Sequence, residues 1–318
     1  MKPLLSVVIP SRDCLAFLPD AIASIRRQNI GAEAIGAVEI VVVDDGSSDG
    51  TSDYLAQAAA ADPLLRAIRG PARGVAAARN AGIAASSGDL IAFLDADDQY
   101  LPDALTDRLA LMAADDSVAL TFADVMSVDP QGRLVGYQFD YWPLFRAFLA
   151  GRSGLVPLGE NAFAMLLAEM VCGTSSVLTR RSALEAVGGF DERYRISEDW
   201  DLWLKLARHG AVWCSTHRAT RYLVRPGSTS RNMAELARTM RQVFDAQVPD
   251  PGRIPQPWRG VAQARVRIAE AEVAMVEGRH LAAMGRHLSA FAAAPSVVTA
   301  KKAAADGLRL LRLKPPVT

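Results

Sequence analysis

Short apolar runs alternate with helical segments through the first 125 residues, and this alternation constrains the fold more than any other feature. The apolar runs are Ser6–Pro10, Val38–Val43, Leu90–Leu94 and Val118–Phe122. The segments with helical spacing between them are Leu15–Arg27, Asp53–Ala61, Gly74–Ala85 and Pro102–Ala114. Because near-continuous apolar strands are typical of parallel sheets covered by helices on both faces, the sequence predicts an α/β fold with a mixed, mainly parallel sheet.

Polar residues follow three of these runs directly. They are Ser11, Arg12 and Asp13, then Asp44 and Asp45, then Asp95, Asp97 and Asp98. In open α/β sheets, ligands bind outside the carboxyl ends of the strands. We therefore expect the three strand ends to form one acidic rim around a ligand.

The triplet Asp95-Ala96-Asp97 is the part of this rim that suggests a metal ion. Side chains two residues apart on an extended segment point the same way, and two carboxylates repel each other unless a cation lies between them. Oxygen ligands of this kind suit Mg²⁺ or Mn²⁺. An isolated Asp-x-Asp is more often a strand-end turn followed by a helix cap, so the triplet alone leaves both interpretations open.

Charge and cysteine content exclude some classes of protein. Lys plus Arg and Asp plus Glu are both 35, whereas general nucleic-acid binders usually carry a basic excess. The three cysteines, Cys14, Cys172 and Cys214, form no C-x-x-C pair and suit a reducing compartment. No apolar stretch reaches the roughly 18 residues of a membrane-spanning helix. We expect a cytoplasmic protein without nucleic-acid partners, at most peripheral to a membrane.

Six motifs in a fixed order carry a specific resemblance. They are Ser6–Ser11, Val41–Thr51, Ala78–Gly82, Ser87–Asp98, Gly188–Glu192 and Glu198–Trp200. The set resembles family 2 glycosyltransferases, which have the GT-A fold, over about residues 4 to 230. The resemblance implies an inverting transferase that uses a nucleotide-sugar donor, by default a UDP-sugar, and a saccharide or lipid-linked acceptor, with a role in cell-surface polysaccharide synthesis.

The resemblance also implies roles for the residues of the rim. Pro10, Ser11 and Asp13 would lie along the nucleoside. Asp44 would accept a hydrogen bond from the base, and Arg79 would hold the base or the diphosphate. Asp95, followed by Ala96, would contact the ribose or a metal-bound water. Asp97 would bind Mn²⁺ or Mg²⁺ directly. Taken singly, Asp44 in a capping turn and Arg79 on a solvated helix face are equally good interpretations.

Glu198 and Asp199 form a second acidic pair, in the first turn of an expected helix capped by Ser197. Acids there also complement the helix dipole, so a structural role is common. The resemblance implies that Asp199 is the catalytic base, which takes the proton of the attacking hydroxyl. Trp200 could stack on an acceptor sugar, but helical spacing with Trp203 favours a core position. Thr174–Ser176 either line the sugar pocket or belong to a packed strand.

One position departs from the family pattern. Many relatives have Tyr-Arg-x-His after the Glu-Asp helix, with the histidine in the metal shell, whereas this chain has Tyr222-Leu223-Val224-Arg225. An arginine cannot bind a cation. Either water or phosphate completes the coordination, or Arg225 neutralises the diphosphate directly and weakens metal dependence. The segment Pro226–Asn232, with Arg231, has the composition of a lid.

We expect a GT-A domain over residues 1–235, with a nucleotide-binding half to about 125 and an acceptor half over 126–235. A helical extension would cover 236–318. Its basic residues alternate with Leu and Val, which favours packing on the main domain or a homodimer contact over a surface for anionic lipid. Two other functions were weighed. A sugar nucleotidyltransferase would normally have a Gly-rich basic loop after the first strand, and a non-catalytic nucleotide-sugar binder would not need both acidic pairs.

Overall fold

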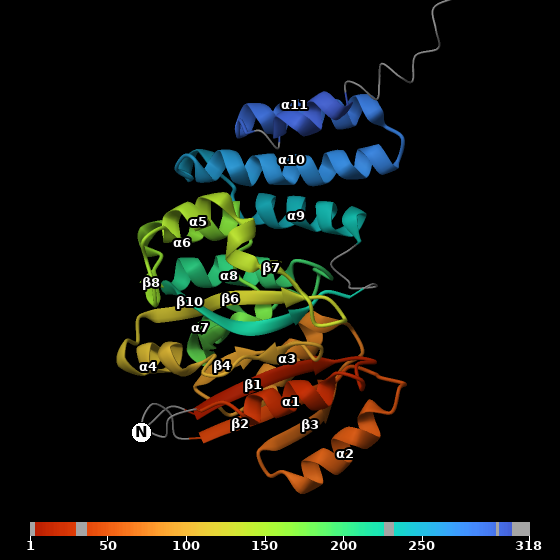
Figure 1. Ribbon diagram of the computed structural model, residues 1–318, viewed down its shortest axis with the longest axis vertical. Helices are drawn as coiled ribbons and strands as arrows, with labels where there is room; N and C mark the ends of the chain where they lie inside the picture. Colours follow the sequence, from red (N-terminus) through yellow and green to blue (C-terminus); the bar gives the residue numbers. More distant parts are fainter. Residues whose placement is uncertain (1–3, 30–36, 226–231, 297–298, 307–318) are drawn as a thin grey trace, which may run out of the picture. The chain divides into compact units, whose positions relative to one another are not determined.

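The computed structural model describes residues 4–29, 37–225, 232–296 and 299–306, and these divide into two compact units (Figure 1). The first unit is Met1–Phe163 with Met170–Pro226, and the second is Ala164–Glu169 with Gly227–Thr318. All strands in the described ranges belong to the first unit. The predicted division of the chain at residue 235, and of the main domain at residue 125, stays a prediction.

The first unit contains one mixed sheet of ten strands. The strands are β1 (Leu4–Ser11), β2 (Ala37–Asp44), β3 (Leu65–Arg69), β4 (Leu90–Phe93), β5 (Gln99–Tyr100), β6 (Val118–Val128), β7 (Leu134–Tyr137), β8 (Leu155–Pro157), β9 (Leu178–Arg180) and β10 (Ala211–Leu223). Their order is β3-β2-β1-β4-β9-β6-β10-β5, with β7 beside β6 and β8 beside β10. The longer pairs β1–β2, β1–β4, β2–β3 and β6–β10 are parallel, and the short pairs made by β5, β7, β8 and β9 are antiparallel, which confirms the predicted mixed, mainly parallel sheet.

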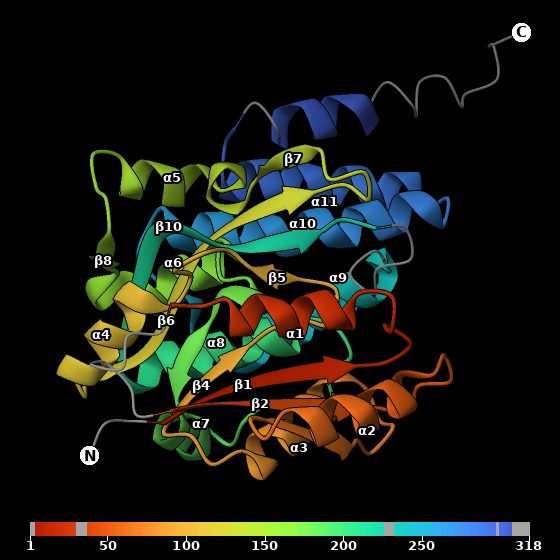
Figure 2. The same ribbon diagram turned by 60° about the horizontal axis from the view of Figure 1, so that its bottom comes forward.

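Helices cover both faces of this sheet, as Figure 2 shows for α1 and α3. The helices of the first unit are α1 (Leu18–Arg26), α2 (Thr51–Ala61), α3 (Val75–Ala85), α4 (Thr106–Ala114), α5 (Pro143–Leu149), α7 (Arg181–Val187) and α8 (Glu198–His209), while α6 (Ala162–Ala168) falls mostly in the second unit. Alternate residues of β2 reach opposite faces: Val42 joins a buried cluster with α1, α2 and α4, and Val41 and Val43 pack on Ala78 of α3. Successive side chains of a strand point to opposite faces, and both faces of this sheet are buried. The strands therefore appear in the sequence as continuous apolar runs.

The structure corrects several predicted elements. Helices α1 and α4 begin at Leu18 and Thr106, three to four residues later than predicted, and Pro102 lies outside the helix. The expected strand over Val171–Leu178 is instead a 3-10 turn, Thr174–Ser176, followed by β9. Ser197 precedes α8 in a left-handed conformation, and its side chain makes no cap hydrogen bond.

The aromatic segment 127–161 packs in part against the sheet. Phe139 and Phe145 are buried, and their ring centroids lie 4.9 Å apart, edge to face. Both rings also contact Phe122 of β6. Aromatic packing therefore holds these two residues in place, whereas Tyr141 is exposed.

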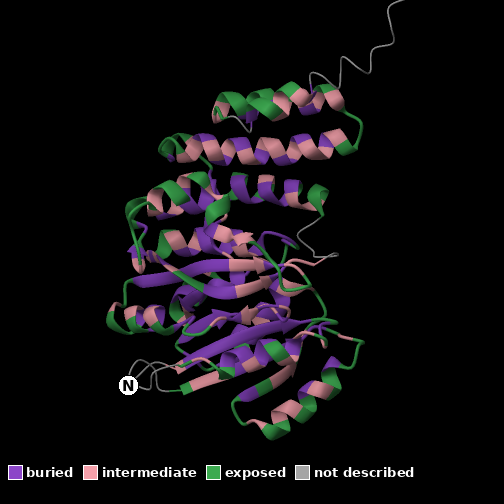
Figure 3. Cartoon of the chain, viewed as in Figure 1, coloured by how far each residue is buried: buried purple, intermediate pink, exposed green. Residues whose placement is uncertain are grey.

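The second unit contains α9 (Met233–Gln247), α10 (Trp258–Val276) and α11 (His280–Ala293). Small buried side chains form its interior, with Ala271, Ala274 and Ala283 packed together between α10 and α11. Figure 3 shows the exposed residues along α11, which include Leu281, Leu288 and Phe291. Within the part of the chain that the structure describes, no helix is both long and apolar enough to span a membrane.

Candidate active site

The carboxyl ends of β1 and β2 bring the first predicted site residues together. The two strands pair in parallel with Ser11 opposite Asp44, and the amide of Asp45 donates to the Ser11 carbonyl at 2.8 Å. Pro10 and Ser11 are buried in β1, and the Ser11 hydroxyl has no hydrogen-bond partner among the residues that the structure describes. Asp13 is exposed, and its Oδ1 accepts hydrogen bonds from the amide and hydroxyl of Ser48. The loops after the two strands are therefore tied to each other.

Asp44 is buried at this edge, and both of its carboxylate oxygens accept hydrogen bonds. The Ser47 amide donates to Oδ1 at 2.9 Å, and the Ser52 hydroxyl donates to Oδ2. Burial alone would raise the pKa of Asp44, but the hydrogen bonds from Ser47 and Ser52 outweigh it and the pKa lies below its ordinary value. The carboxylate is thus held ionised in one orientation.

The carboxylate of Asp45, the next residue, bonds backbone amides of the loop before α3. Its two oxygens accept from the amides of Ala72 at 2.7 Å and Gly74 at 2.9 Å. These bonds fix the loop that leads into α3, the helix that carries Arg79. Asp45 therefore positions the second half of the rim rather than facing a ligand.

Arg79 is the centre of a buried ionic network. Its guanidinium bonds Asp95 Oδ1 at 2.7 Å with one terminal nitrogen and Glu198 Oε1 at 2.6 Å with the other. It also lies over the Phe190 ring, 5.3 Å from the centroid. Arg79 is 3% exposed, so it links the end of β4 to the start of α8 from inside the protein.

Burial and charge oppose each other in this network. Burial alone would lower the pKa of Arg79, but Asp95 and Glu198 raise it above its ordinary value, so the guanidinium stays charged. For Glu198, burial and the neighbouring Asp199 charge raise the pKa to about 7, although Arg79 acts in the opposite direction. The prediction that Arg79 contacts the donor stays a prediction, and the contacts that the structure gives it are to carboxylates.

Asp97 pairs with the arginine that departs from the family pattern. Arg225, two residues beyond β10, bonds Asp97 Oδ2 through Nε at 2.7 Å. The two side chains are 32% and 22% exposed, respectively. The Arg225 guanidinium lies 5.5 Å from the Phe17 ring centroid, and one terminal nitrogen is 3.9 Å from Cys14 Sγ. The other prediction for this stretch, a lid over Pro226–Asn232 that includes Arg231, falls outside the described residues except at Asn232.

Asp98 and Ser175 are site residues that the sequence did not single out in these roles. The Ser175 hydroxyl accepts from the Asp95 amide at 3.0 Å and donates to Asp98 Oδ2 at 2.5 Å. Burial, followed by the charges of Asp95 and Asp97, raises the pKa of Asp98 well above its ordinary value. The run of hydroxyls in an apolar stretch was the available signal, because buried hydroxyls need partners.

Asp199 is the second residue of α8, next to the Arg79 network, and is half-buried. The Thr174 hydroxyl donates to its Oδ2 at 2.8 Å, and its Oδ1 accepts from the Trp200 amide at 2.7 Å. The 3-10 turn over Thr174–Ser176 thus contacts both acidic pairs, at Asp95 and at Asp199. Trp200 and Trp203 are buried, which favours their core interpretation.

Residues of the motifs Ala78–Gly82 and Gly188–Glu192 pack together next to this site. Asn80, next to Arg79, accepts from the Phe190 amide at 3.0 Å and donates to the Phe190 carbonyl at 2.9 Å. Gly189 has a φ of 68°, and a Cβ there would lie 2.9 Å from Asn80 Oδ1, so glycine suits the position. Phe190 then packs on Phe93 and Trp203. Motifs more than one hundred residues apart therefore form one layer beneath the acidic rim.

The acidic triplet offers carboxylate oxygens as possible metal donors. Ala96 is buried in the core, while Asp95 and Asp97 are partly exposed. Over the described ranges, Asp95 Oδ2 and Asp97 Oδ1 have no hydrogen-bond partner, and no cluster of three His, Cys, Asp or Glu side chains could enclose a metal. Two carboxylate oxygens fit Mg²⁺ or Mn²⁺, which usually take their other ligands from phosphate and water.

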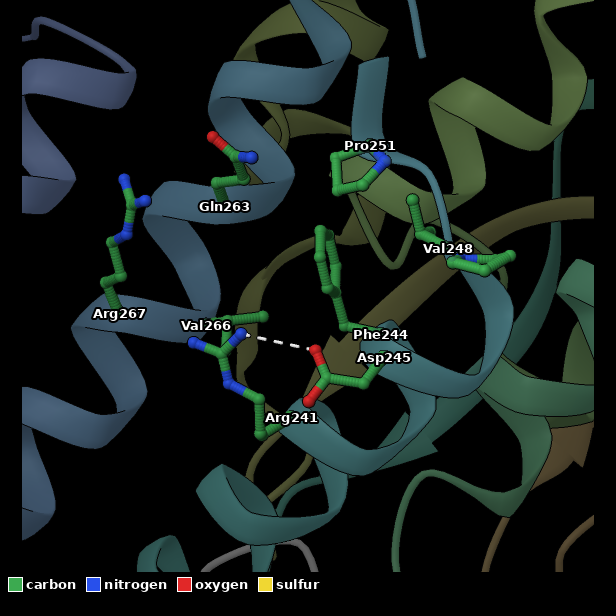
Figure 4. Close-up of a pocket in the computed structure, with 9 residues that line it drawn as sticks. Arg241, Phe244, Asp245, Val248, Pro251, Gln263, Val266 and Arg267 are labelled. Atoms are coloured by element: carbon green, nitrogen blue, oxygen red, sulfur yellow. Dashed lines mark hydrogen bonds and ion pairs between the residues drawn. The ribbon is translucent and has the colours of Figure 1, made fainter. Parts of the chain in front are cut away.

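A pocket in the second unit holds none of these residues (Figure 4). It measures about 350 Å³ and lies between α9, α10 and the turn at Pro251. Arg241, at its wall, is paired with Glu270 at 2.9 Å and with Asp245 at 3.4 Å. The charge of this arginine is therefore already neutralised within the unit.

Comparison with known proteins adds a family assignment for most of the first unit. The model of the family described as Glycosyl transferase family 2 matches residues 6–188. Chondroitin synthase of Escherichia coli is 27% identical over 208 residues, which are 65% of this chain and 27% of that protein. A PGL/p-HBAD biosynthesis glycosyltransferase of Mycobacterium tuberculosis is 29% identical over 224 residues, which are 70% of this chain and 74% of that protein. The chain thus spans about a quarter of the length of the chondroitin synthase.

Solved structures agree in fold. A mannosyltransferase from Pyrobaculum calidifontis, in complex with GDP-Man and Mn²⁺, has a TM-score of 0.60 at 21% identity, covering 99% of this chain and 82% of that one. Residues 1–349 of S. aureus TarS, in complex with UDP-GlcNAc, have a TM-score of 0.59 at 16% identity, covering 96% and 89%. At this level of identity the likeness establishes the GT-A fold.

Proposed function

The chain belongs to glycosyl transferase family 2, and we propose that it is an inverting glycosyltransferase that moves a sugar from a nucleotide-sugar donor to a hydroxyl group. The donor is a UDP-sugar by default, and the acceptor is a saccharide or a lipid-linked saccharide. The observation that carries the proposal is the Asp95–Arg79–Glu198 network, because it ties the acidic triplet to the residue next to Asp199. One buried cation thus holds Asp95, on the donor side, and Glu198, the residue that precedes the proposed base Asp199.

On the donor side, we propose that Pro10, Ser11 and Asp13 lie along the nucleoside and that Asp44 accepts an N–H of the base. The hydrogen bonds from Ser47 and Ser52 support this role, because they hold Asp44 ionised and fixed. A carboxylate has about four lone-pair sites and donates none, so Asp44 retains acceptor capacity toward uracil N3–H. The unpartnered Ser11 hydroxyl beside it is available for the same nucleoside.

We propose that Asp97 binds Mn²⁺ or Mg²⁺ together with the donor diphosphate, and that Asp95 contacts the ribose or a metal-bound water. The unbonded oxygens Asp95 Oδ2 and Asp97 Oδ1 support this, as does the Mn²⁺ named with GDP-Man in the Pyrobaculum calidifontis structure. When bound, a divalent cation neutralises charge that develops on the leaving diphosphate. Arg79 keeps Asp95 in place, and Arg225 supplies a second positive group for phosphate.

Asp199 is the proposed base. It takes the proton of the acceptor hydroxyl as that oxygen forms a bond to the anomeric carbon of the donor, and the bond from that carbon to the diphosphate breaks with its electron pair on the phosphate oxygen. Thr174 and the Trp200 amide orient the carboxylate. Glu198 does not compete for this role, because it is buried and paired with Arg79.

The experiment that tests the proposal compares transfer with donor binding. Asp199→Asn keeps the shape of the side chain but removes the base, so transfer should fall by about 10²–10⁴-fold, while the donor dissociation constant changes little. Glu185→Gln, an exposed carboxylate on α7, is the matched control and should transfer normally. A thermal-shift panel of UDP-, GDP-, dTDP- and CMP-sugars with Mn²⁺ identifies the donor. Normal transfer by Asp199→Asn would refute the base assignment.

The product separates this proposal from the nucleotidyltransferase alternative. Sugar transfer releases a nucleoside diphosphate, whereas a sugar nucleotidyltransferase releases pyrophosphate. A non-catalytic binder would release neither while still responding in the thermal-shift panel. The kinship with chondroitin synthase supports a place in cell-surface polysaccharide synthesis, and cytoplasmic nucleotide-sugars would supply the donor.

The C-terminal helices are proposed as a contact surface of this enzyme. Leu281, Leu288 and Phe291 on α11 are 72%, 52% and 39% exposed, and basic residues surround them in the sequence. Flotation with anionic vesicles and light scattering, applied to the full chain and to a Leu281→Glu, Leu288→Glu variant, distinguish a membrane contact from a homodimer. Leu134→Glu, at a leucine that is 54% exposed in the first unit, is the control.

A further inference from the structure

Asp97, the proposed metal ligand, is already paired with a positively charged side chain in this structure. Arg225 Nε lies 2.7 Å from Asp97 Oδ2, and the remaining oxygen, Oδ1, has no partner among the described residues. A divalent metal on Oδ1 would share one carboxylate with a guanidinium. Because like charges at such short range repel strongly, metal and Arg225 compete for Asp97.

Arg225 can exchange its ion-pair partner, unlike Arg79, the other arginine that bonds the triplet. Its side chain is 32% exposed and bonds one carboxylate through one of its five N–H groups. Across the described ranges, its only further polar contact is the 3.9 Å approach to Cys14 Sγ. The terminal N–H groups are therefore available to a second anion, and their planar fork matches a phosphate.

Arg79 lacks this freedom. It is buried, and its two terminal nitrogens are bonded to Asp95 and Glu198. If Arg79 moved, two carboxylates near the protein interior would lose their counter-ion, which is strongly unfavourable. Of the two arginines that bond the triplet, Arg225 is the one that can exchange partners.

We propose that Arg225 is a built-in counter-ion that pairs with Asp97 in the absence of substrate and moves to the diphosphate when donor and metal bind. This inference rests on the proposed function. The donor thereby removes the competitor from the metal ligand. Metal and nucleotide then bind with positive coupling, and the factor by which each strengthens the other is the same by thermodynamic linkage. The metal therefore binds together with the donor and is not a permanently bound ion.

The test measures Mn²⁺ binding directly, by the electron paramagnetic resonance signal of unbound Mn²⁺, with and without UDP. In the unmodified chain, UDP should lower the Mn²⁺ dissociation constant at least tenfold. Arg225→Gln removes the competing charge, so it should bind Mn²⁺ alone at least tenfold more tightly than the unmodified chain, and UDP should strengthen its Mn²⁺ binding by a smaller factor than in the unmodified chain. Metal-free UDP binding by this variant should be weaker.

Two further variants separate charge from geometry. Arg225→Lys keeps a positive charge on Asp97 but has no planar fork, so Mn²⁺ alone should bind as weakly as in the unmodified chain while metal-free UDP binding falls. Arg12→Gln removes a positive charge from an exposed side chain after β1 that does not contact Asp97. It should leave Mn²⁺ binding within about twofold.

The outcomes are distinct for the inference and for the proposed function. Equal Mn²⁺ affinities for Arg225→Gln and the unmodified chain would overturn the inference, and so would an equal gain for Arg12→Gln, which would indicate a general charge effect. Asp97→Asn should abolish the measured Mn²⁺ binding. If it does not, or if no nucleotide binds to the unmodified chain, the proposed site itself is wrong and the inference falls with it.

Discussion

The two arginines that bond the acidic triplet have similar ion-pair distances and opposite environments. Arg79 to Asp95 and Arg225 to Asp97 are both 2.7 Å contacts. Arg79 is buried between two carboxylates, whereas Arg225 is about one-third exposed and holds one. A contact distance therefore says little about what an ion pair does. The number of partners and the access to water separate a fixed scaffold from an exchangeable contact.

The carboxylates differ in the same way. Asp95 is held by Arg79 and, through its amide, by the Ser175 hydroxyl, and its neighbour Asp98 is buried. Asp97 has Arg225 as its described side-chain partner. Within three residues the chain thus combines a rigid position and an adaptable one. Such a combination suits a site that must keep its shape while a charged ligand enters and leaves.

Removing Arg79 should have the largest effect on stability. Arg79→Gln leaves Asp95 and Glu198 without their shared counter-ion, and breaking a buried pair in this way costs about 3–5 kcal/mol. Urea unfolding followed by tryptophan fluorescence measures the loss, since Trp203 lies in the same layer. Arg79→Lys should lose less, because it keeps the charge. A loss below about 1 kcal/mol in Arg79→Gln would show that the buried network is not a scaffold.

The pH dependence of the free energy of unfolding should reveal the ionisation of Glu198. Its pKa in the folded protein is about 7, above the ordinary 4.5, so the folded state holds the proton more tightly than the unfolded state. Its contribution to stability is present below about pH 4.5 and is lost as pH rises through 7. Because the pKa rises from 4.5 to about 7, the loss is about 3 kcal/mol.

Glu198→Gln isolates this contribution. The variant should match the unmodified chain near pH 4 and be more stable by about 3 kcal/mol at pH 8. Asp98, whose pKa is also raised, affects both proteins equally and cancels in the difference. If Glu198→Gln is instead the less stable protein at pH 8, the attraction of the ionised Glu198 to Arg79 exceeds its burial penalty.

Ser175 offers a smaller test of the rigid side. Ser175→Ala removes the hydroxyl that accepts from the Asp95 amide and donates to Asp98. Leaving buried polar groups without a partner costs about 1–3 kcal/mol. Ser176→Ala is the matched control, since its hydroxyl bonds only the nearby Gly173 carbonyl and should cost about 0.5–1.5 kcal/mol. Equal losses in the two variants, measured by thermal unfolding, would remove the special role of Ser175.

The fold could be predicted where apolar periodicity is strong. Runs at Val38–Val43 and Leu90–Leu94 became β2 and β4, and the helix predicted over Gly74–Ala85 is α3, which begins one residue later, at Val75. Strand β3 was missed, because Leu-Arg-Ala-Ile-Arg sits at the sheet edge and alternates with exposed arginine. A packed strand is one of two interpretations that the sequence allows for Thr174–Ser176, but the structure has a turn there, because hydroxyls of the segment bond Asp98 and Asp199 and those tertiary contacts outweigh local propensity.

The types of residue at the site could also be predicted, but not their partners. Acids at strand ends follow from the sheet, and the resemblance supplies their proposed roles. The pairing of Arg79 with Glu198 spans 119 residues, and that of Asp97 with Arg225 spans 128. No local pattern encodes contacts of that separation. The difference between a buried and a half-exposed arginine arises from packing, which the sequence does not display.

Arg225→Gln should have the smallest effect on folding and thereby complete the comparison. Half-exposed ion pairs contribute about 0–1 kcal/mol, so the variant should unfold within that range of the unmodified chain. Salt distinguishes the two arginines further, because the Debye length falls from about 10 Å at 0.1 M to about 3 Å at 1 M. Any deficit of Arg225→Gln should vanish in 1 M NaCl, whereas that of Arg79→Gln should persist, since salt screens buried pairs poorly. A deficit above about 2 kcal/mol that resists salt would mean that Arg225 is as fixed as Arg79, and Asp97 could then not exchange its cation.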